Sequence, residues 1–405
     1  MSPVAPPTRS APARAAPAPL HTIPICRRPR PTLAQRLHLV LFNLSFLTLC
    51  LVLHAFQLLS VPFRPLQRLA KEAFGSVLVA LVALFGPSTL VVTVQEGEEC
   101  SLDEVVSKDP SGRVVGLRLD RHAVLVSNHQ MYADWIYPWI AMSYAGVANG
   151  LVIVLKASLE WAPLVGPAMQ LFRFCFINST TKPLDKSNLV PVAREAQRRG
   201  EAYQCLLFPE GTLYSSLTRP KSKLYADKVG IPDTTHVLLP RSLGLFHTLT
   251  ALSLSPSAPF PNLTLYDLTL AYPGVPAQGY AQDYYRLQTL FGLRVPPPTV
   301  HLHVRRVRKV ATAEDGPLAA AAPPRGSREE FDAWLGARWR EKDALMGHFG
   351  DRGTFEGGPG VARGRAELPI RLRAGDALKI GTVCAAVALG AWGVWAVWGL
   401  WRGGW

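Results

Sequence analysis

The chain has 405 residues, of which 48% are hydrophobic and 18% are charged, and its formal net charge is +14. This length suffices for a buried core, but the composition is apolar for a soluble protein, so part of the chain is expected to lie in lipid. The positive balance predicts an acidic partner, and since the basic residues are spread along the chain without a nucleic-acid-binding motif, we expect lipid head groups and not nucleic acid.

The first part of the chain divides into a basic arm and two apolar runs. Residues 1–36 are rich in proline and alanine and carry six arginines but no acidic residue, which predicts a disordered arm. Residues 37–63 contain no Asp, Glu, Lys or Arg and are long enough to cross a bilayer as a helix. A second such run covers residues 73–95 and is expected to pass from helix into the strand "TLVVTV". We therefore predict membrane-associated hydrophobic helices over residues 37–95, either spanning the bilayer or dipping into it.

Residues 96–310 form the body of the protein. Short apolar runs alternate there with helix-like stretches, which is the pattern of an α/β layered domain. The strand-like runs are "HAVLVSN", "LVIVLKA", "FRFCFI", "YQCLLFP", "HVLLPR", "NLTLYDLTLAY" and "VHLHVRRVRKV". His301 and His303 in the last run are followed by several arginines, so we interpret that run as an exposed basic strand and not as a metal site.

The rest of the chain is divided into three parts. Residues 311–327 are a predicted linker, and residues 328–376 a helical segment that is amphipathic and packs on the body or lies on the membrane. Its apolar residues at helical spacing are Phe331, Trp334, Leu335, Trp339 and Leu345. Residues 377–405 are predicted to form a transmembrane helix, and the basic residues before it place the body in the cytosol. The six cysteines lack zinc-site spacing and indicate free thiols, as in a cytosolic compartment.

Two stretches carry polar residues that could perform chemistry. In "SNHQMYADW", His129 follows a predicted buried strand, where α/β sheets place ligands, and Asp134 comes five positions later. A carboxylate within reach of an imidazole can orient it as a base that removes a proton from a hydroxyl. In "FPEGT", Glu210, Gly211 and Thr212 also follow an apolar run, and such a turn can bind a hydroxyl or a phosphate. Either stretch alone is compatible with a purely structural role.

Together these blocks establish a resemblance. "NHQMYADW" and "LFPEGT", with "K-x-S-L-x-W-x-P-L-V-G" between them and "VLLPRS" after them, closely resemble the glycerolipid acyltransferase family of acyl-CoA-dependent lysophospholipid acyltransferases. The similarity covers roughly residues 120–310, and weaker similarity is found in "YDLTLAYPG" and "WREKDALMGHF". The Tyr-Ala-Asp-Trp form of the first block is most similar to the branch with lysocardiolipin, lysophosphatidylglycerol and lysophosphatidylinositol acyltransferases.

The resemblance implies a fold, a reaction and a set of site residues. The fold would be a mixed sheet flanked by helices, and the reaction would transfer an acyl group from acyl-CoA to a lysophospholipid at the endoplasmic reticulum membrane, with the catalytic domain facing the cytosol. His129 would be the general base and Asp134 its orienting partner. The residues expected to bind substrate are Glu210, Gly211, Thr212, Arg241 and Lys156. Acyl-CoA would be a co-substrate, and neither a metal nor a bound cofactor is expected.

One position departs from the family pattern. Ser179 stands where the family usually has an arginine that binds the acceptor phosphate, so we expect Arg173, Lys182 or Arg241 to supply that charge. Two alternatives stay open, and the departure argues mildly against the first and suggests the second. One is a 1-acylglycerol-3-phosphate acyltransferase of glycerolipid synthesis, and the other is a membrane scaffold or lipid-binding protein whose catalytic site has decayed.

Overall fold

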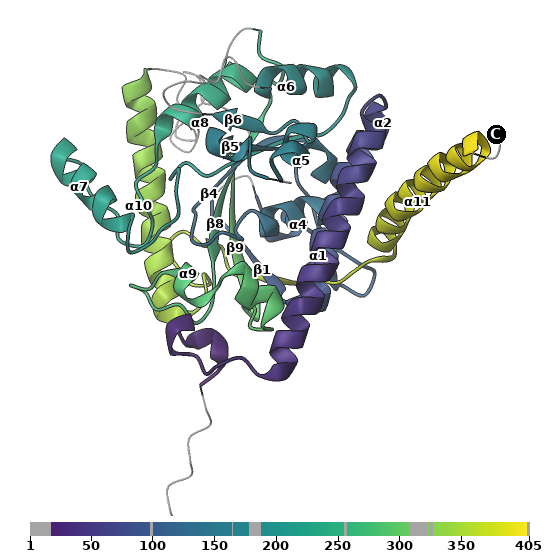
Figure 1. Cartoon of the computed structure of the whole chain (residues 1–405). Coiled ribbons are helices and arrows are strands. Elements are labelled where there is room, and N and C mark those ends of the chain that lie inside the picture. The colour runs from purple at the N-terminus through teal and green to yellow at the C-terminus, as the bar shows by residue number, and fades with distance from the viewer. Residues whose placement is uncertain are drawn as a thin grey trace, which may run out of the picture.

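A computed structural model describes residues 18–97, 100–163, 165–177, 188–254, 257–307, 323 and 327–402 of the chain. An eight-stranded mixed sheet lies at its centre, with the strand order β10-β1-β9-β8-β4-β7-β5-β6, and helices cover both faces of that sheet (Figure 1). The α/β class and the mixed sheet flanked by helices are therefore confirmed.

The strands of this sheet run mostly parallel. They are β1 (Thr89–Val94), β4 (His122–Ser127), β5 (Leu151–Lys156), β6 (Cys175–Ile177), β7 (Tyr203–Leu207), β8 (Thr264–Ala271), β9 (Thr299–Val307) and β10 (Ala366–Pro369). Only the pairs β8–β9 and β1–β10 are antiparallel. The short strands β2 (Val106–Lys108) and β3 (Val114–Leu117) form a separate antiparallel pair.

Alternate residues of the strands face two hydrophobic layers, as β4 shows. Ala123 and Leu125 pack on one side in a core with α2 (Arg64–Phe85) and α4 (Ile136–Tyr144). Val124 and Val126 pack on the other side in a second core. The helices of that second layer are α6 (Leu189–Arg198), α8 (Ser242–Leu249) and α10 (Arg328–Arg352). This alternation buries both faces of β4 and leaves its end to carry polar residues.

The remaining helices are peripheral or short. They are α1 (Leu33–Ser60), α3 (Leu102–Val105), α5 (Val165–Leu171), α7 (Arg219–Val229), α9 (Ala281–Tyr284) and α11 (Ala374–Arg402). Single 3-10 turns occur at Leu20–Thr22, Ile25–Arg27, Ala148–Gly150 and Ala157–Leu159, and π-helical turns at Thr250–Leu254 and Gln288–Gly292.

The predicted disorder of residues 1–36 is wrong for residues 18–36, and residues 1–17 lie outside the described part. The Arg28 guanidinium donates a hydrogen bond of 2.6 Å to the backbone oxygen of Tyr284, which ties the segment to the body. Thr32 and Gln35 then form a capping box at the start of α1. Composition alone did not predict this order, because it depends on a long-range contact.

The second apolar run is part of the folded body and not of a membrane hairpin. Most of α2 after Ala70 is buried in the core, and β1 pairs with β9 and β10 inside the sheet. The run lacks charges because protein surrounds it. In contrast, α1 exposes a stripe of leucines, and it is one of two described helices that are long and apolar enough to cross a membrane. The other is the Ala374–Ala396 part of α11.

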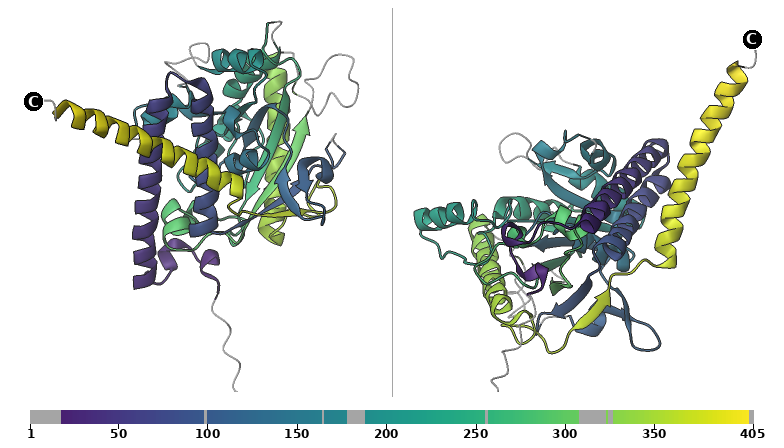
Figure 2. Two further views of the ribbon diagram at one scale, coloured as in Figure 1. Left: turned by 90° about the vertical axis from the view of Figure 1, so that its right-hand side faces the viewer. Right: turned by 60° about the horizontal axis from the view of Figure 1, so that its bottom comes forward.

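The carboxyl-terminal region combines a packed helix with an exposed one. α10 buries Phe331, Leu335 and Trp339 against the body, so it does not lie on a membrane. The predicted helical segment 328–376 is wrong after Arg352, because β10 follows and pairs with β1. α11 then leaves the body and shares one side of the molecule with α1 and α2 (Figure 2).

β9 is central and buried, so the prediction of an exposed basic strand is wrong. It lies between β1 and β8, and His303 is 2% exposed. The two nitrogens of His303 face the Thr93 hydroxyl and the Gln95 side-chain oxygen, each at 3.1 Å. Burial, followed by the charge of Arg305, lowers the pKa of His303 to about 3, so this ring is neutral at physiological pH. The basic residues on β9 gain carboxylate partners instead of solvent, such as Glu341 for Arg305.

Candidate active site

His129 and Asp134 meet in a tight turn after β4. The chain turns at residues 131–136 through bonds from the Asp134 amide to the Met131 oxygen and from the Ile136 amide to the Ala133 oxygen. This brings Asp134 Oδ2 to 2.9 Å from His129 Nδ1, and the same oxygen accepts hydrogen bonds from the Gln130 and Met131 amides. The Asp134 side chain is fully buried, whereas the His129 side chain is 20% exposed.

The geometry leaves the other ring nitrogen of His129 free for a substrate. Within the described residues, Nε2 has no hydrogen-bond partner, and the ring stacks on Phe208 with 4.5 Å between the centroids. An imidazole held through Nδ1 by a buried carboxylate keeps its Nε2 lone pair outward, as a general base requires. The predicted His129–Asp134 pair is therefore present in space as well as in sequence.

Sequence reasoning missed Tyr272, which lies directly after β8. Its hydroxyl donates a hydrogen bond of 2.5 Å to Asp134 Oδ1, the oxygen that His129 does not use. Burial, followed by the nearby Asp134 charge, raises the pKa of Tyr272 well above its usual range, so the hydroxyl stays protonated and acts as a donor. The available signal was a tyrosine at the end of a predicted strand in "YDLTLAYPG".

We expect Tyr272→Phe to weaken the support of Asp134 without removing the base. The buried oxygen Oδ1 loses its described hydrogen-bond donor, which should cost about 1–3 kcal/mol of folding free energy. Thermal unfolding of the purified protein measures the loss of stability, and kcat should fall with little change in KM. The matched control is Tyr225→Phe on the exposed surface of α7, which should behave as wild type. Equal unfolding temperatures for Tyr272→Phe and Tyr225→Phe would contradict the assignment.

Glu210 lies on the buried side of the His129 turn and is 2% exposed. Its two oxygens accept hydrogen bonds of 3.3 Å from the backbone amides of His129 and Leu238, so the side chain joins the His129 turn to the "VLLPRS" loop. Burial raises the pKa of Glu210 to about 8, although both backbone hydrogen bonds oppose that rise. In the described structure the Glu210 side chain holds the backbone of the His129 turn and of the "VLLPRS" loop from the protein interior.

Gly211, Thr212 and Arg241 lie at the surface next to Glu210. Gly211 has φ +70°, and a β-carbon added there would lie 3.3 Å from Cδ of Arg241, so the arginine side chain passes over the glycine. The Arg241 amide also donates a bond of 2.7 Å to the Pro209 oxygen, which joins the two loops. Gly211, Thr212 and Arg241 are exposed, so they are accessible to a ligand beside His129.

The other cations predicted for the site are not gathered around His129. Arg173 forms a 2.5 Å ion pair with Glu195, in a pocket at the amino-terminal ends of β5 and β7. The strands β4, β7 and β5 are parallel, and the His129 turn follows the carboxyl end of β4. The pocket at the amino-terminal strand ends therefore lies on the opposite side of the sheet, measured along the strands. Lys156 is exposed at the carboxyl end of β5, on the same edge as His129 but two strands away. Lys182 lies outside the described residues, as does Ser179.

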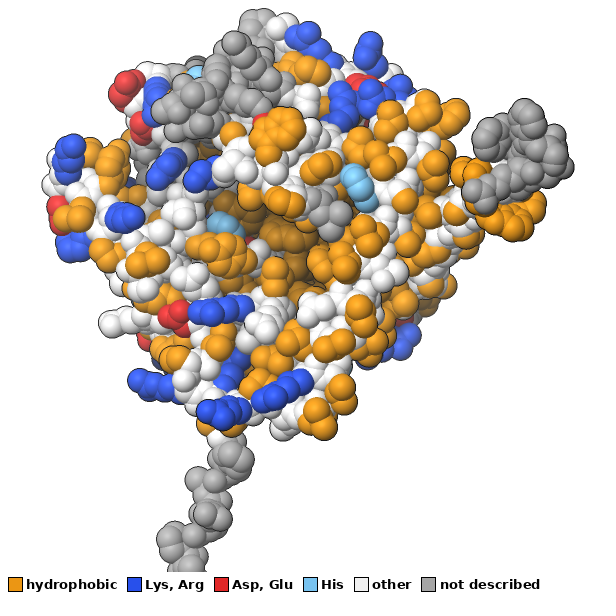
Figure 3. Space-filling model, viewed as in Figure 1, with side chains coloured by type: hydrophobic (Ala, Val, Ile, Leu, Met, Phe, Trp, Pro, Cys, Tyr) orange, Lys and Arg blue, Asp and Glu red, His pale blue; other side chains and the backbone are white. Residues whose placement is uncertain are grey.

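A hollow lies in the face of the molecule shown in Figure 1. Figure 3 shows hydrophobic side chains lining this hollow over the middle of the sheet, with a histidine exposed at its edge and basic side chains nearby. Apolar walls beside cationic side chains suit a ligand with both a hydrocarbon part and an anionic part.

Comparison with known proteins agrees with this geometry. The acyltransferase family model matches residues 103–268. An uncharacterized acyltransferase of Schizosaccharomyces pombe is 33% identical over 290 residues, which are 71% of this chain and 75% of that protein. The chain belongs to the acyltransferase family. The resemblance predicted from the sequence blocks is confirmed.

Two further relatives of this acyltransferase have names that state a substrate. The 2-acyl-1-lysophosphatidylinositol acyltransferase of Saccharomyces cerevisiae is 32% identical over 60% of this chain and 64% of its own length. Lysocardiolipin acyltransferase 1 of Danio rerio is 31% identical over 56% of this chain and 52% of its own length. Both names agree with the predicted branch of the family.

The acyltransferase site also depends on residues beyond the matched segment. Tyr272 comes shortly after the end of this segment, and two residues of α10 support the site from further along the chain. Asp343 accepts hydrogen bonds from the backbone amides of residues 235–237, which shapes the loop before Arg241. Lys342 is 3% exposed and binds Asp267, the backbone oxygen of Leu268 and the Thr269 hydroxyl. A lysine on the buried side of a predicted amphipathic helix was the sequence signal for this contact.

The bonds of Asp343 also explain why "HVLLPR" is not a strand. Residues 236–241 have no regular secondary structure, since the amides of His236 and Val237 donate to Asp343 and that of Leu238 donates to Glu210. Pro240 has no amide hydrogen, which further reduces the number of groups that could pair with a neighbouring strand. The expectation of a strand there is wrong.

Proposed function

We propose that this acyltransferase transfers a fatty acyl group from acyl-CoA to the free hydroxyl of a lysophospholipid. The observation that carries the proposal is the His129–Asp134 pair, in which a buried carboxylate holds Nδ1 of a partly exposed ring and leaves Nε2 without a partner among the described residues. The hollow with apolar walls and the names of the two relatives support a lipid acceptor.

The reaction follows from the chemistry of this pair. His129 Nε2 removes the proton of the acceptor hydroxyl while its oxygen attacks the thioester carbonyl carbon, and Asp134 stabilises the imidazolium that forms. The carbon–sulfur bond then breaks, CoA leaves as the thiolate, and the imidazolium returns its proton to the sulfur. No nucleophile from the protein takes part, because the acceptor oxygen itself forms the new ester bond.

Of the two candidate cations that the structure describes, Arg241 is the better placed to hold the acceptor phosphate. It is exposed beside Gly211, whereas Arg173 is bound to Glu195 at the other edge of the sheet. We expect Arg241→Gln to raise KM for the lysophospholipid about tenfold with a smaller effect on kcat, since a charge-assisted hydrogen bond contributes roughly 1.5–3 kcal/mol. Steady-state kinetics at varied lysolipid concentration measure this split. An unchanged KM would exclude Arg241, and Arg113→Gln on the exposed turn between β2 and β3 is the matched control.

The proposed location is the endoplasmic reticulum membrane, with the catalytic domain facing the cytosol. Two helices with lipid-compatible surfaces, α1 and α11, support membrane attachment. Both proposed substrates also place the active site next to a bilayer, because lysophospholipid and acyl-CoA partition to its surface.

A panel assay tests the function and identifies the acceptor. Purified wild-type protein and the His129→Ala variant are incubated with labelled acyl-CoA and lysophospholipids that differ in head group, including 1-acylglycerol-3-phosphate. We expect acylation of one or a few lysophospholipids by wild type alone. Preference for 1-acylglycerol-3-phosphate would favour the alternative suggested by an Arabidopsis thaliana relative, a probable 1-acyl-sn-glycerol-3-phosphate acyltransferase that is 29% identical over 57% of this chain. No acylation of any acceptor by wild type would refute the proposal.

A further inference from the structure

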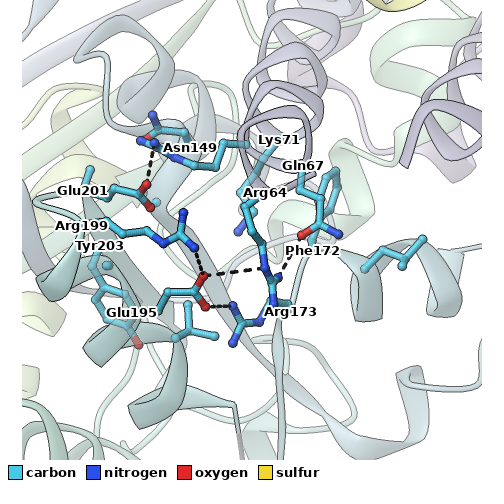
Figure 4. Close-up of a pocket in the computed structure, with 16 residues that line it drawn as sticks. Arg64, Gln67, Lys71, Asn149, Phe172, Arg173, Glu195, Arg199, Glu201 and Tyr203 are labelled. Carbon is cyan, nitrogen blue, oxygen red and sulfur yellow. Dashed lines mark hydrogen bonds and ion pairs between the residues drawn. The ribbon is translucent and has the colours of Figure 1, made fainter. Parts of the chain in front are cut away.

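A second pocket lies at the opposite edge of the sheet from His129. It has a volume of about 70 Å³ and is formed by α2, α6, the end of α5 and the amino-terminal ends of β5 and β7 (Figure 4). Five cationic side chains line it, which are Arg64, Arg68, Lys71, Arg173 and Arg199. Such a concentration of positive charge has no part in the chemistry proposed for His129.

Two carboxylates in the pocket compensate only part of this charge. Figure 4 shows Glu195 between three arginines, with nitrogen–oxygen distances of 2.5 Å to Arg173, 3.4 Å to Arg199 and 3.7 Å to Arg64. Glu201 accepts a hydrogen bond of 2.8 Å from Arg68. Four arginines and Lys71 against two carboxylates leave a net positive charge among the described residues of the lining, even when Lys71 is neutral. The positive charges that share this pocket repel one another, so an anion that entered the pocket would be stabilised.

Lys71 is the deepest of these cations and has no carboxylate partner among the described residues. It is 8% exposed, donates to the Leu151 backbone oxygen at 2.7 Å, and lies 5.7 Å from the centre of the Phe174 ring. Burial, followed by the charges of Arg173 and Arg68, lowers the pKa of Lys71 to about 7. A buried ammonium group with unused hydrogens is unfavourable in the empty pocket and favourable beside an anion.

The position of the pocket relative to α1 indicates where the anion comes from. The carboxyl end of α1 and the turn after it expose Leu58, Leu59, Val61 and Phe63, and Arg64 follows immediately. Gln57 also donates to the Ala168 oxygen, which fixes α1 against α5 beside the pocket. A bilayer that takes up these apolar side chains ends at the start of α2, where its head groups would meet Arg64 and Arg68.

We propose that this pocket binds the phosphate group of an anionic phospholipid of the surrounding membrane, as a site separate from the catalytic one. The guanidinium groups of Arg64 and Arg199 receive the phosphate at the mouth of the pocket, and the acyl chains remain in the bilayer along α1. The side chains of these two arginines are 44% and 46% exposed, so a lipid head group can reach them from outside the pocket. Binding there anchors the end of α1 and the start of α2 at the level of the head groups.

A titration of the full-length protein in a neutral detergent tests the proposal. Isothermal titration calorimetry measures binding of three probes: dioctanoylphosphatidylserine, dioctanoylphosphatidylcholine and inorganic sulfate. We expect sulfate to bind weakly, phosphatidylserine to bind at least tenfold more tightly than sulfate, and the double substitution Arg64→Gln/Arg199→Gln to weaken both at least tenfold. Arg352→Gln removes one surface charge far from the pocket and should bind as wild type.

Each result bears on a different part of the proposal. Equal affinities in wild type and the double variant would overturn the site. Sulfate binding without any preference for phosphatidylserine would overturn its assignment to a lipid, and equal binding of phosphatidylcholine would overturn the requirement for net negative charge. His129→Ala should bind all probes as wild type does, so the outcome is independent of the proposed acyl transfer.

The pH dependence gives a second test that does not rely on the arginines. The charge of sulfate does not change near neutral pH, whereas Lys71 loses its proton as the pH rises through about 7. Sulfate affinity should therefore fall severalfold between neutral and mildly alkaline pH in wild type, and this fall should be absent in Lys71→Met. The same fall in both proteins would show that Lys71 does not face the anion.

Discussion

His129→Ala is expected to lower kcat/KM for acyl transfer by about 10²- to 10⁴-fold, because it removes the proposed general base while leaving the residues proposed to bind the substrates in place. The remaining rate would come from binding and orientation alone. The measurement is release of CoA from acyl-CoA in the presence of the best acceptor. KM for the acceptor should change little, since the His129 ring is held by Asp134 and Phe208 and binds no phosphate.

The control for this substitution is His247→Ala on the exposed side of α8, which keeps the histidine count equal between the two variants. It should retain wild-type activity. Circular dichroism should match for all three proteins, and the unfolding temperature of His129→Ala should fall no further than that of Tyr272→Phe, because Asp134 Oδ2 keeps its two backbone donors. Full activity of a folded His129→Ala variant would disprove the mechanism, although the family membership would stand.

Lys342→Met is expected to give the largest loss of stability, about 3–5 kcal/mol of unfolding free energy. It leaves the Asp267 carboxylate, otherwise 2.6 Å from Lys342 Nζ, in a protein interior where, among the described residues, the remaining cation near it is Arg305 at 3.9 Å. It also removes the hydrogen bonds from α10 to the Leu268 backbone oxygen and the Thr269 hydroxyl on β8. Denaturant unfolding in detergent measures the change.

Two further variants separate the ion pair from general effects of losing a lysine. Lys223→Met breaks an exposed pair with Asp227 on α7 and should cost no more than about 1 kcal/mol. The double variant Asp267→Asn/Lys342→Met removes the uncompensated charge and should recover part of the loss. If Lys342→Met were no worse than Lys223→Met, the buried pair would not stabilise the contact between α10 and the sheet.

Sequence patterns predicted the strands well where local hydrophobicity determines them. "YQCLL" and "TLVVTV" coincide with β7 and β1, since short, mainly apolar runs without a charged residue suit strands that are buried on both faces. The patterns gave a wrong prediction where a side chain distant in sequence determines the backbone conformation. An example is "HVLLPR", in which the His236 amide donates to Asp343, more than a hundred residues later. Arg28 is a similar case at the other end of the chain.

Hydrophobicity alone also could not distinguish lipid from protein as the surroundings of a helix. The sequences of most of α1 and of most of α2 are both uncharged and apolar. However, α2 is enclosed by the sheet, α4 and α11, whereas α1 remains exposed on its outer side. Polar residues were equally ambiguous about their surroundings. The histidines and arginines of β9 suggested a strand exposed to solvent. They are buried because partners such as Thr93, Gln95 and Glu341 come from other segments.

The candidate site was predictable as far as its residues are close in sequence or belong to a family block. His129, Asp134 and Glu210 meet as expected, and Arg241 is next to Gly211. Tyr272 was not predicted, because its function depends on the register that sets the end of β8 beside the end of β4. Arg173 was misplaced for the related reason that its position before β6 directs it to α6.

The order of the strands has a consequence for synthesis of the protein. β1 is among the first parts of the sheet to leave the ribosome, yet it pairs with β9, and its Thr93 meets His303 from 210 residues later. At about 5–20 residues per second, roughly 10–40 s pass before that partner exists. During this interval the apolar strand "TLVVTV" has an open edge that can pair with other chains. We expect nascent chains that end before residue 299 to need a chaperone or an early membrane contact of α1 to remain unaggregated.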